Sequence, residues 1–568
     1  MKNLLTFLVV LVTLSKSFFA QVCTNPQAKI DIHGNNIRAR ILNGGDLFTN
    51  FNNGVFFPNP GSTGNHNPST IFAAGLWMGG IDQAGDLKIA TVDYRSSGKY
   101  DYTAGPLNED GTTTANDCAN WDQHFRVTGA EIAGFLNALP LTPADLKAQF
   151  PGVAGWPGNA NPYFSEIYGY DLPLNSQGLA PFFDTNQNGS YDPIEGDYPA
   201  VQLRGIPLFV PAEMVWSVFN DQNGGAPHSN SGGKPFRAEI QLTTWAFNCA
   251  DQPVLNNTLF TSHKIINRGA DPVDSTFIGI WADVDLGCSS DDYAGSNPAL
   301  NTMYAYNQDA VDGMPGNECQ GTPTFPDAAP VQSITFLNNP LSKFIAPNNA
   351  GIGNPPLATT DPTNPSEIFN FLSGTWRDGS PLTFGGNGFG GNVPVDHLYS
   401  DDPANPNGWS MCTANLGFSD RRIIGTSKYG KLLPGQIEEL NIAWAFHPNP
   451  SLPCGLGTTF SDVAKLRDLY NDDFAGVCSP LSKAPVLPAD SLTLFPNPTA
   501  TTALLRYGAL QPFSLRAFDA AGRMVFEKTA GFEKKETIIE TATLASGIYT
   551  LQIVTDQGVA TKKLAVVR

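Results

Sequence analysis

Polar and apolar residues alternate along Glu239-Ile-Gln-Leu-Thr-Thr-Trp-Ala-Phe247. A period of two places successive side chains on opposite faces of an extended chain, so this stretch predicts a half-buried β-strand. Pro323–Asn407 is rich in Pro, Gly and Asn, and it predicts long surface loops between strands. Further strand-like runs, separated by turn clusters, are Ile71–Met78, Leu87–Tyr94, Met214–Phe219, Ala238–Phe247, Thr258–Asn267, Ser275–Val284 and Ile437–Phe446. The chain is therefore expected to be mainly β, with a β-sandwich body and long loops.

Two helices are expected among these strands. The clearer one is Ser461–Tyr470, where the Ser461 hydroxyl can cap the free amides and apolar residues recur on one face. The other is Thr142–Phe150, with Pro143 in its first turn.

The first twenty residues predict export from the cytoplasm. Met1-Lys2-Asn3 is cationic, Leu4–Leu14 is almost wholly apolar, and the small residue Ala20 precedes Gln21. This order is typical of a cleaved secretory signal, so residues 1–20 are assigned as a signal peptide, with an uncleaved N-terminal anchor as the alternative. The apolar run is shorter than the roughly 20 residues of a spanning helix, and no transmembrane segment is expected.

Charge is unevenly distributed along the chain. The whole sequence carries −19, while residues 1–20 carry +2 and residues 491–568 carry +3, which leaves −24 on the part between them. An acidic body repels phosphate, so nucleic acid and anionic lipid are not expected as partners. The negative charge of the body favours the binding of divalent cations. The alternative is that the charge only keeps the protein in solution. By its length the acidic body, residues 21–478, is expected to contain two or more subdomains.

All eight cysteines lie in this body, at positions 23, 118, 249, 288, 319, 412, 454 and 478. An even number in an exported protein predicts disulfides, up to four of them. The pairing stays open, because eight cysteines allow 105 connectivities. The sequence contains no C-x-x-C, which disfavours zinc and thioredoxin-like chemistry.

A change of pattern marks a separate tail. Residues 479–490 contain Pro480, Pro485 and Pro488 and are expected to be a linker, because proline stiffens the chain and interrupts sheet pairing. Residues 491–568 follow as a compact domain, whose strands are expected at Leu492–Phe495, Ala503–Arg506, Phe513–Asp519, Val525–Lys528, Thr537–Glu540, Ile548–Thr555 and Lys563–Val567. Seven short strands in this space predict an immunoglobulin-like β-sandwich.

The tail contains four short motifs, in this order: Leu494-Phe-Pro496-Asn497-Pro498, Asp519-x-x-Gly522-Arg523, Leu544-x-x-Gly547-x-Tyr549 and Lys562-Lys563-Leu. In this order and spacing they resemble the type A C-terminal sorting domain of the type IX secretion system of Bacteroidota. The resemblance implies recognition by the outer-membrane translocon and its sorting machinery. Removal of the domain and attachment to surface lipopolysaccharide, or release, would follow. An ordinary β-sandwich accessory domain is the alternative.

The body carries a resemblance of its own. Val215-Trp-Ser-Val-Phe-Asn-Asp221, Ile265-Ile-Asn-Arg268 and Trp281-Ala-Asp-Val-Asp-Leu-Gly287 are similar to segments of large secreted Bacteroidota proteins that have the same sorting tail. This second resemblance implies architecture and export, and it implies no activity.

One loop matches a calcium-binding pattern. Asp184-Thr-Asn186-Gln-Asn188-Gly189-Ser190-Tyr-Asp192-Pro-Ile-Glu195 fits D-x-[DN]-x-[DN]-G-x5-E over its full length. Calcium prefers six to eight oxygen ligands, and one turning loop can supply them. The expected ligands are the side chains of Asp184, Asn186 and Asn188, the carbonyl of Ser190, Asp192 through water, and Glu195. Because Pro193 enters the loop, a calcium-tied loop in a β-rich body is expected rather than a helix–loop–helix, with an empty Asx-rich turn as the alternative.

Four aspartates form a second candidate metal site: Asp283, Asp285, Asp291 and Asp292. Asp283 and Asp285 are two residues apart, so on a strand both carboxylates face one side. Calcium, a general acid–base pair and a solvated strand end are three interpretations of this group.

Motifs of enzyme families are absent from the sequence: it has no G-x-S-x-G, no H-E-x-x-H and no P-loop. Gly386-Asn-Gly388-Phe-Gly-Gly391 fits G-x-G-x-x-G, but no strand–helix frame surrounds it, so nucleotide binding is not expected. The sequence favours an exported, calcium-stabilised protein with an adhesive, structural or glycan-binding role, whose partners are the type IX machinery and surface lipopolysaccharide or glycans. A secreted hydrolase of polysaccharide or protein is the main alternative, and a passive spacer is another.

Overall fold

The computed structural model describes residues 23–59, 67–95, 98–173, 177–222, 228–313, 319, 323–351, 354–417, 419–448, 450–451, 453–478, 492–507, 510, 512–519, 524–528, 535–555 and 558–568. The expected signal peptide and the expected Pro-rich linker lie outside these residues. The fold is mainly β, as predicted, and its body is built on two nine-stranded antiparallel sheets.

The first sheet has the order β1-β2-β3-β5-β16-β21-β20, with β4 paired to β2 and β6 paired to β5. Its strands are β1 (Lys29–Ile32), β2 (Ile37–Leu42), β3 (Asp46–Leu47), β4 (Phe56–Pro58), β5 (Ala73–Asp82), β6 (Leu87–Ala90), β16 (Val273–Asp283), β20 (Lys343–Ile345) and β21 (Arg422–Leu432). The predicted strands at Ile71–Met78, Leu87–Tyr94 and Ser275–Val284 correspond to β5, β6 and β16.

The second sheet has the order β17-β18-β19-β22-β15-β14-β13-β7, with β8 paired to β13. Its strands are β7 (Thr103–Ala104), β8 (Phe125–Thr128), β13 (Glu213–Asn220), β14 (Ala238–Ala246), β15 (Thr258–Asn267), β17 (Asp292–Asn297), β18 (Thr302–Asn307), β19 (Val331–Phe336) and β22 (Ile437–His447). The remaining predicted body strands correspond to β13, β14, β15 and β22.

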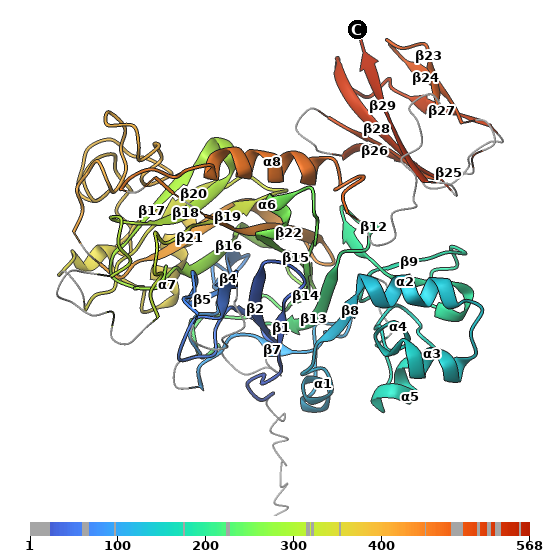
Figure 1. Ribbon diagram of the computed structural model, residues 1–568, viewed down its shortest axis with the longest axis horizontal. Helices are drawn as coiled ribbons and strands as arrows, with labels where there is room; N and C mark the ends of the chain where they lie inside the picture. The colour runs from blue at the N-terminus through green and yellow to red at the C-terminus, as the bar shows by residue number, and fades with distance from the viewer. Residues whose placement is uncertain are drawn as a thin grey trace, which may run out of the picture.

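Both faces of the second sheet are covered (Figure 1). On β13, Val215 and Phe219 lie in the core shared with the first sheet, whereas Trp216 and Val218 lie in a second core on the outer side. All nine residues of β14 are consequently buried. The prediction of a half-buried strand at Glu239–Phe247 is therefore wrong: on the face that was expected to meet solvent, Trp245 and Phe247 lie in the second core and Gln241 donates to the Gly178 carbonyl at 2.9 Å.

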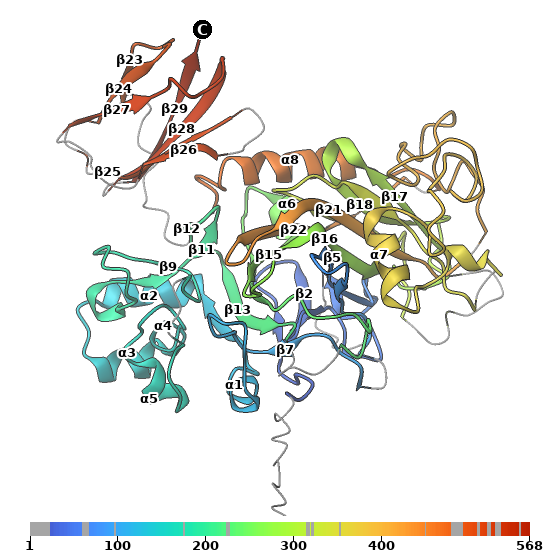
Figure 2. The same ribbon diagram turned by 180° about the vertical axis from the view of Figure 1, so that it is seen from behind.

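The covering elements come from distant parts of the chain. The insertion, seen at one end of the body in Figure 2, contains α2 (Gly129–Ala138), α3 (Pro143–Gln149), α4 (Pro151–Ala154) and α5 (Phe164–Tyr168). Between it and β13 lie the short strands β9 (Phe182–Phe183), β10 (Tyr198–Pro199), β11 (Val201–Leu203) and β12 (Ile206–Phe209). The other helices are α1 (Ala115–Asn120), α6 (Pro253–Asn256), α7 (Pro365–Ser373) and α8 (Thr459–Asn471).

The two expected helices are present as α3 and α8. The Thr142 hydroxyl caps α3 by accepting a hydrogen bond from the Asp145 amide at 3.2 Å, and Pro143 begins the helix. Helix α8 begins two residues before the expected start, and Ser461 does not cap it, because its hydroxyl donates to the Thr458 carbonyl at 2.7 Å. The stretch Pro323–Asn407 is not only loop: it contributes β19 to the middle of the second sheet, and also β20 and α7.

The tail forms a small β-sandwich with its own core, in which Leu505, Leu515, Leu551 and Leu564 are buried. Its two sheets have the orders β23-β24-β27 and β26-β25-β28-β29. The strands are β23 (Thr493–Phe495), β24 (Thr502–Arg506), β25 (Pro512–Phe518), β26 (Met524–Lys528), β27 (Glu536–Glu540), β28 (Gly547–Thr555) and β29 (Gly558–Val566). Each corresponds to one of the seven strands predicted from the sequence.

Arg204 and Asp473 of the body make contacts with the tail. The Gln552 side-chain amide donates to Asp473 Oδ2 at 2.6 Å, and Asp473 also pairs with Arg204. The guanidinium of Arg204 lies 6.0 Å from the centre of the Phe518 ring. The hydrophobic cores of the two parts are separate.

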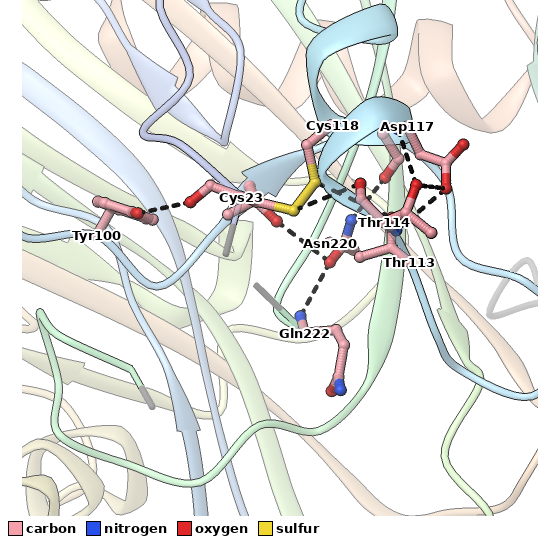
Figure 3. Close-up of a disulfide and its surroundings, with 10 residues drawn as sticks. Cys23, Tyr100, Thr113, Thr114, Asp117, Cys118, Asn220 and Gln222 are labelled. Carbon is pink, nitrogen blue, oxygen red and sulfur yellow. Dashed lines mark hydrogen bonds between the residues drawn. A yellow bond between two sulfur atoms is a disulfide. The ribbon is translucent and has the colours of Figure 1, made fainter. Parts of the chain in front are cut away.

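All eight cysteines pair, as the even count predicted: Cys23–Cys118, Cys249–Cys478, Cys288–Cys319 and Cys412–Cys454. Figure 3 shows the Cys23–Cys118 bond beside the capping box formed by Thr114 and Asp117 at the start of α1. The Tyr100 hydroxyl donates to the Cys23 carbonyl at 2.9 Å, which further fixes this N-terminal end of the body. Among the described residues, none of the helices has the length and apolar character that a membrane crossing requires.

Candidate functional sites

The loop Asp184–Glu195 is the connection of a small hairpin. Strand β9 precedes it, and β10, which follows it, pairs with β9 through Tyr198↔Phe183. The Asp184 carboxylate accepts hydrogen bonds from the amides of Gln187 at 2.6 Å and Gly189 at 2.8 Å. Gly189 has a φ of +78°, where a side chain would be strained. These bonds fold the loop back on its first residue.

Three of the other expected ligands line the same turn. Asn186 Oδ1 accepts from the Asn188 amide at 3.1 Å, and Asn188 Oδ1 accepts from the Ser190 amide at 2.7 Å. The Asn186 side-chain amide donates to Glu195, so residues nine positions apart are brought into contact. The structure thereby brings the first, middle and last parts of the pattern into one exposed turn.

Asp192 and Asp197 anchor the end of this loop. Asp192 Oδ1 accepts from the Ile194 amide at 3.1 Å and starts a 3-10 helix, Pro193–Glu195. Asp197 is fully buried and accepts from the amides of Thr185 and Asp192, both at 2.8 Å. Burial raises the pKa of Asp197. Sequence reasoning missed Asp197, because it lies two residues beyond the pattern and has a supporting role.

The four predicted aspartates separate into two groups. In the first, oxygens of Asp283, Asp285 and Asp420 lie within 4.8 Å of one another. Asp283 Oδ2 accepts from the Tyr94 hydroxyl at 2.6 Å, and Arg422 lies 3.7 Å from the same oxygen and 2.5 Å from Asp420. Burial raises the pKa of Asp283 to about 7 and that of Asp285 well above its usual value. One arginine thus faces three acids here.

The second group contains Asp291, Asp292 and Asp312. Oxygens of Asp291 and Asp312 lie within 4.8 Å of each other and of Cys288 Sγ, which is bonded to Cys319 and so offers no thiolate. Burial raises the pKa of Asp291 to about 6 and of Asp312 to about 7, and raises that of Asp292 well above its usual value. Asp312 and Asp420 were missed, since each approaches its group from a distant segment.

The expected sorting residues meet at the edge of the tail. Asn497 donates to the Lys563 carbonyl and accepts from the Ala565 amide, both at 2.8 Å, so the turn Pro496-Asn497-Pro498 is attached to β29. Lys562 donates to the Leu492 carbonyl at 3.0 Å.

The other sorting residues belong mainly to β28. Gly547 begins this strand, and the Tyr549 hydroxyl donates to the Ala545 carbonyl at 2.8 Å. Lys563 Nζ donates to Thr550 at 2.7 Å, which links β29 to β28 by a side chain. Gly522 lies outside the described residues.

Comparison with protein families identifies the tail. Residues 493–567 match the family described as secretion system C-terminal sorting domain. The tail is a sorting domain of the type IX secretion system, and it directs the chain across the outer membrane to the cell surface or the extracellular space.

Comparisons of the whole chain give little more. None of the curated proteins matches it. Among solved structures, a polysaccharide lyase matches with 8% sequence identity and a TM-score of 0.19, over 58% of this chain. The chain spans about a third of that enzyme, 34% of its length. A match of this quality carries no argument about the body, and the body's resemblance to secreted Bacteroidota proteins stays a prediction.

Proposed function

We propose that the body is a calcium-stabilised, disulfide-braced surface module with an adhesive, structural or glycan-binding role. The type IX machinery exports it, and surface lipopolysaccharide or release is its destination. Because both faces of the second sheet are used for packing, contacts with a partner would be made by loops. Among these roles, an adhesive or glycan-binding contact has the best support.

The observation that carries this choice is an apolar pair on a well-held loop between α7 and β21. Phe384 and Val393 are 52% and 60% exposed, and the Phe384 amide donates to the Val393 carbonyl at 2.8 Å. The Trp409 ring lies 4.9 Å from the Phe384 ring and donates to the Gly386 carbonyl at 3.1 Å. An aromatic ring held in this way offers a flat face to a sugar or an apolar side chain.

The proposed contact of Phe384 is tested by measuring how the whole mature chain binds to immobilised polysaccharides. We expect retention on an array of surface and plant polysaccharides, reduced at least tenfold by Phe384→Ser. Leu433→Ser is the matched control, because Leu433 is also an exposed apolar residue, 49% exposed, between β21 and β22. Cleavage products in the same wells would favour the hydrolase, and equal retention of both variants would refute the role of Phe384.

The loop Asp184–Glu195 is the proposed calcium site of this module. Asp184, Asn186, Asn188 and Glu195 would supply side-chain oxygens, Ser190 its carbonyl, and Asp192 a water-mediated contact. Calcium bound there would hold the β9–β10 hairpin against the insertion. The support is the full pattern together with the contact of Asn186 with Glu195.

Chelation tests this site. Saturation at 100 times the dissociation constant stabilises a protein by about 2.7 kcal/mol, so a chelator should lower the melting temperature of the body by several degrees. Glu195→Gln should weaken binding and remove part of that effect, whereas Glu109→Gln, at an exposed glutamate elsewhere, should not. If neither the chelator nor Glu195→Gln changes the melting temperature, the alternative of an Asx-rich turn without calcium is favoured.

A further inference from the structure

Two loops at one end of the β17–β18 hairpin are locked together. One loop leads from β16 to Asp291, and the other leaves β18 after Asn307. The Gln308 amide donates to the Asp291 carbonyl at 2.8 Å, and the Cys288 amide donates to Asp312 Oδ1 at 2.9 Å. The Cys288–Cys319 disulfide joins the same region. The geometry of these loops is therefore fixed by several bonds.

Three carboxylates are buried between them. Asp291, Asp292 and Asp312 are 1%, 3% and 6% exposed. Among the described residues, no Lys, Arg or His side chain forms an ion pair with any of the three. The guanidinium of Arg421 is bound to main-chain carbonyls instead: it donates to the Asp292 carbonyl at 2.7 Å and to the Gly417 carbonyl at 2.6 Å. Burying an unpaired charge costs several kcal/mol, so an unpaired group of this kind calls for a counter-charge.

Some oxygens in this place also lack a donor. Asp291 Oδ2 accepts from the Gly313 amide at 2.6 Å and Asp292 Oδ2 accepts from the Leu286 amide at 2.9 Å, whereas Asp312 uses both of its oxygens, for the amides of Cys288 and Phe325. Within the described part of the chain, Asp291 Oδ1, Asp292 Oδ1 and Asn307 Oδ1 are buried without a hydrogen-bond donor. Buried polar atoms normally have a hydrogen-bond partner. Three buried oxygens without a donor, in neighbouring residues, therefore indicate a binding place for a cation.

Asn307 is oriented by its own amide group. Its Nδ2 donates to the Val311 carbonyl at 2.9 Å and to the Asp309 carbonyl at 3.3 Å. Asn307 is also the cross-strand partner of Asp292. Its amide oxygen is thus left as an acceptor on the same face of the hairpin as Asp292.

The neighbouring group around Asp283 also contains buried oxygens without a donor, Asp283 Oδ1 and Asp285 Oδ1, but it differs in charge. There Arg422 pairs with Asp283 and Asp420, and Tyr94 donates to Asp283. Because a protein cation already lies in that group, the argument from an uncompensated charge does not extend to it.

We propose that Asp291 and Asp312, whose carboxylate oxygens lie within 4.8 Å of each other, hold a divalent cation in a buried site beside Asp292 and Asn307, and that calcium is its occupant. Hard oxygen ligands favour calcium over zinc or copper, which prefer nitrogen and sulfur donors. The one sulfur nearby belongs to a disulfide. The cation would neutralise the three acids and join the loops after β16 and β18. This site is independent of the loop Asp184–Glu195.

Calcium stoichiometry of the whole mature chain tests the proposal, with native mass spectrometry and equilibrium dialysis after chelator treatment. We expect two calcium ions per chain if the loop Asp184–Glu195 also binds one. Asp312→Asn should lose one ion, or weaken that site at least tenfold, in the presence of an intact loop. Glu195→Gln should lose the other ion, and Asp271→Asn, an exposed acid between β15 and β16, should lose neither.

A stability measurement separates a lost ligand from a misfolded variant. Without calcium, Asp291→Asn should melt at the same or a higher temperature than the unchanged chain, because one buried charge is removed and the remaining oxygen can still accept from Gly313. With saturating calcium the order should reverse. If Asp312→Asn keeps every ion that the unchanged chain binds, the proposal is wrong. If the chain binds a single ion and Glu195→Gln abolishes it, the buried site is refuted and the exposed loop is supported. If only Asp312→Asn loses an ion, the buried site is supported and the loop is not.

Discussion

Removing the Cys249–Cys478 disulfide should cost the body more stability than removing any shorter bridge. Cys249 follows β14, and Cys478 follows α8, so the bond joins the second sheet to the last described residue of the body. The two cysteines are 229 residues apart in sequence and 5.4 Å apart at their Cα atoms. A bond of this kind closes a long loop in the unfolded chain and lowers its entropy.

The expected magnitude follows from the loop length. Chain-entropy theory gives about 5.5 kcal/mol for a loop of this length and about 3.7 kcal/mol for the loop closed by Cys288–Cys319, which has a separation of 31. Cys249 is buried in the outer core, so replacement by Ala rather than Ser avoids an unpaired hydroxyl. The double variant Cys249→Ala/Cys478→Ala should therefore lose about 1.8 kcal/mol more than Cys288→Ala/Cys319→Ala.

Urea unfolding of the mature chain, at fixed calcium and without reductant, measures this difference in the transition of the body. Tryptophan fluorescence follows that transition selectively, because all nine tryptophans precede the tail. An equal loss in the two double variants, or a larger loss from the shorter bridge, would contradict the loop-length reasoning. An unchanged midpoint for Cys249→Ala/Cys478→Ala would show that the bond does not hold the end of the body at all.

Two further predictions concern stability and the boundary between the parts. Burial lowers the pKa of His263 from 6.5 to about 4, so the unfolded chain binds a proton at a higher pH than the folded body does. As the pH falls below 6.5, this histidine should therefore lower the free energy of unfolding by up to about 1.4 kcal/mol per pH unit. Urea titrations at pH 7 and pH 5 should show a smaller loss for His263→Leu than for the unchanged chain, and equal losses would be evidence against a neutral buried His263. Gln552→Ala should lower the free energy of unfolding of the tail by about 1 kcal/mol, because it removes one part-buried hydrogen bond to Asp473, which keeps its pairing with Arg204. A loss of several kcal/mol in calorimetry would indicate a shared fold.

Local sequence signals predicted the fold where neighbouring residues decide the structure. Thr142 and Pro143 set the start of α3, and the strands of the tail follow their turn residues closely. Burial depends on distant parts of the chain and was predicted less well. The outer face of Glu239–Phe247 is buried by residues from distant segments, such as Gly178 and Phe474. The strand β19 lies in a stretch whose Pro, Gly and Asn content indicates loops.

The candidate sites divide in the same way. The loop Asp184–Glu195 is continuous in sequence, so its pattern located every member except the supporting Asp197. The other aspartates were recognised as acids, but the grouping of Asp291 with Asp312 and of Asp283 with Asp420 depends on the sheet. The disulfide partners likewise follow from tertiary contacts, which spacing along the chain does not contain.

Cell fractionation of a type IX-competent bacterium measures the separation of tail and body most directly. The chain that lacks residues 491–568 should remain in the periplasm, with its four disulfides formed and its body transition in urea unchanged. Surface display of that shortened chain, or its collapse into unfolded protein, would contradict a tail that carries the export signal and folds apart from its cargo.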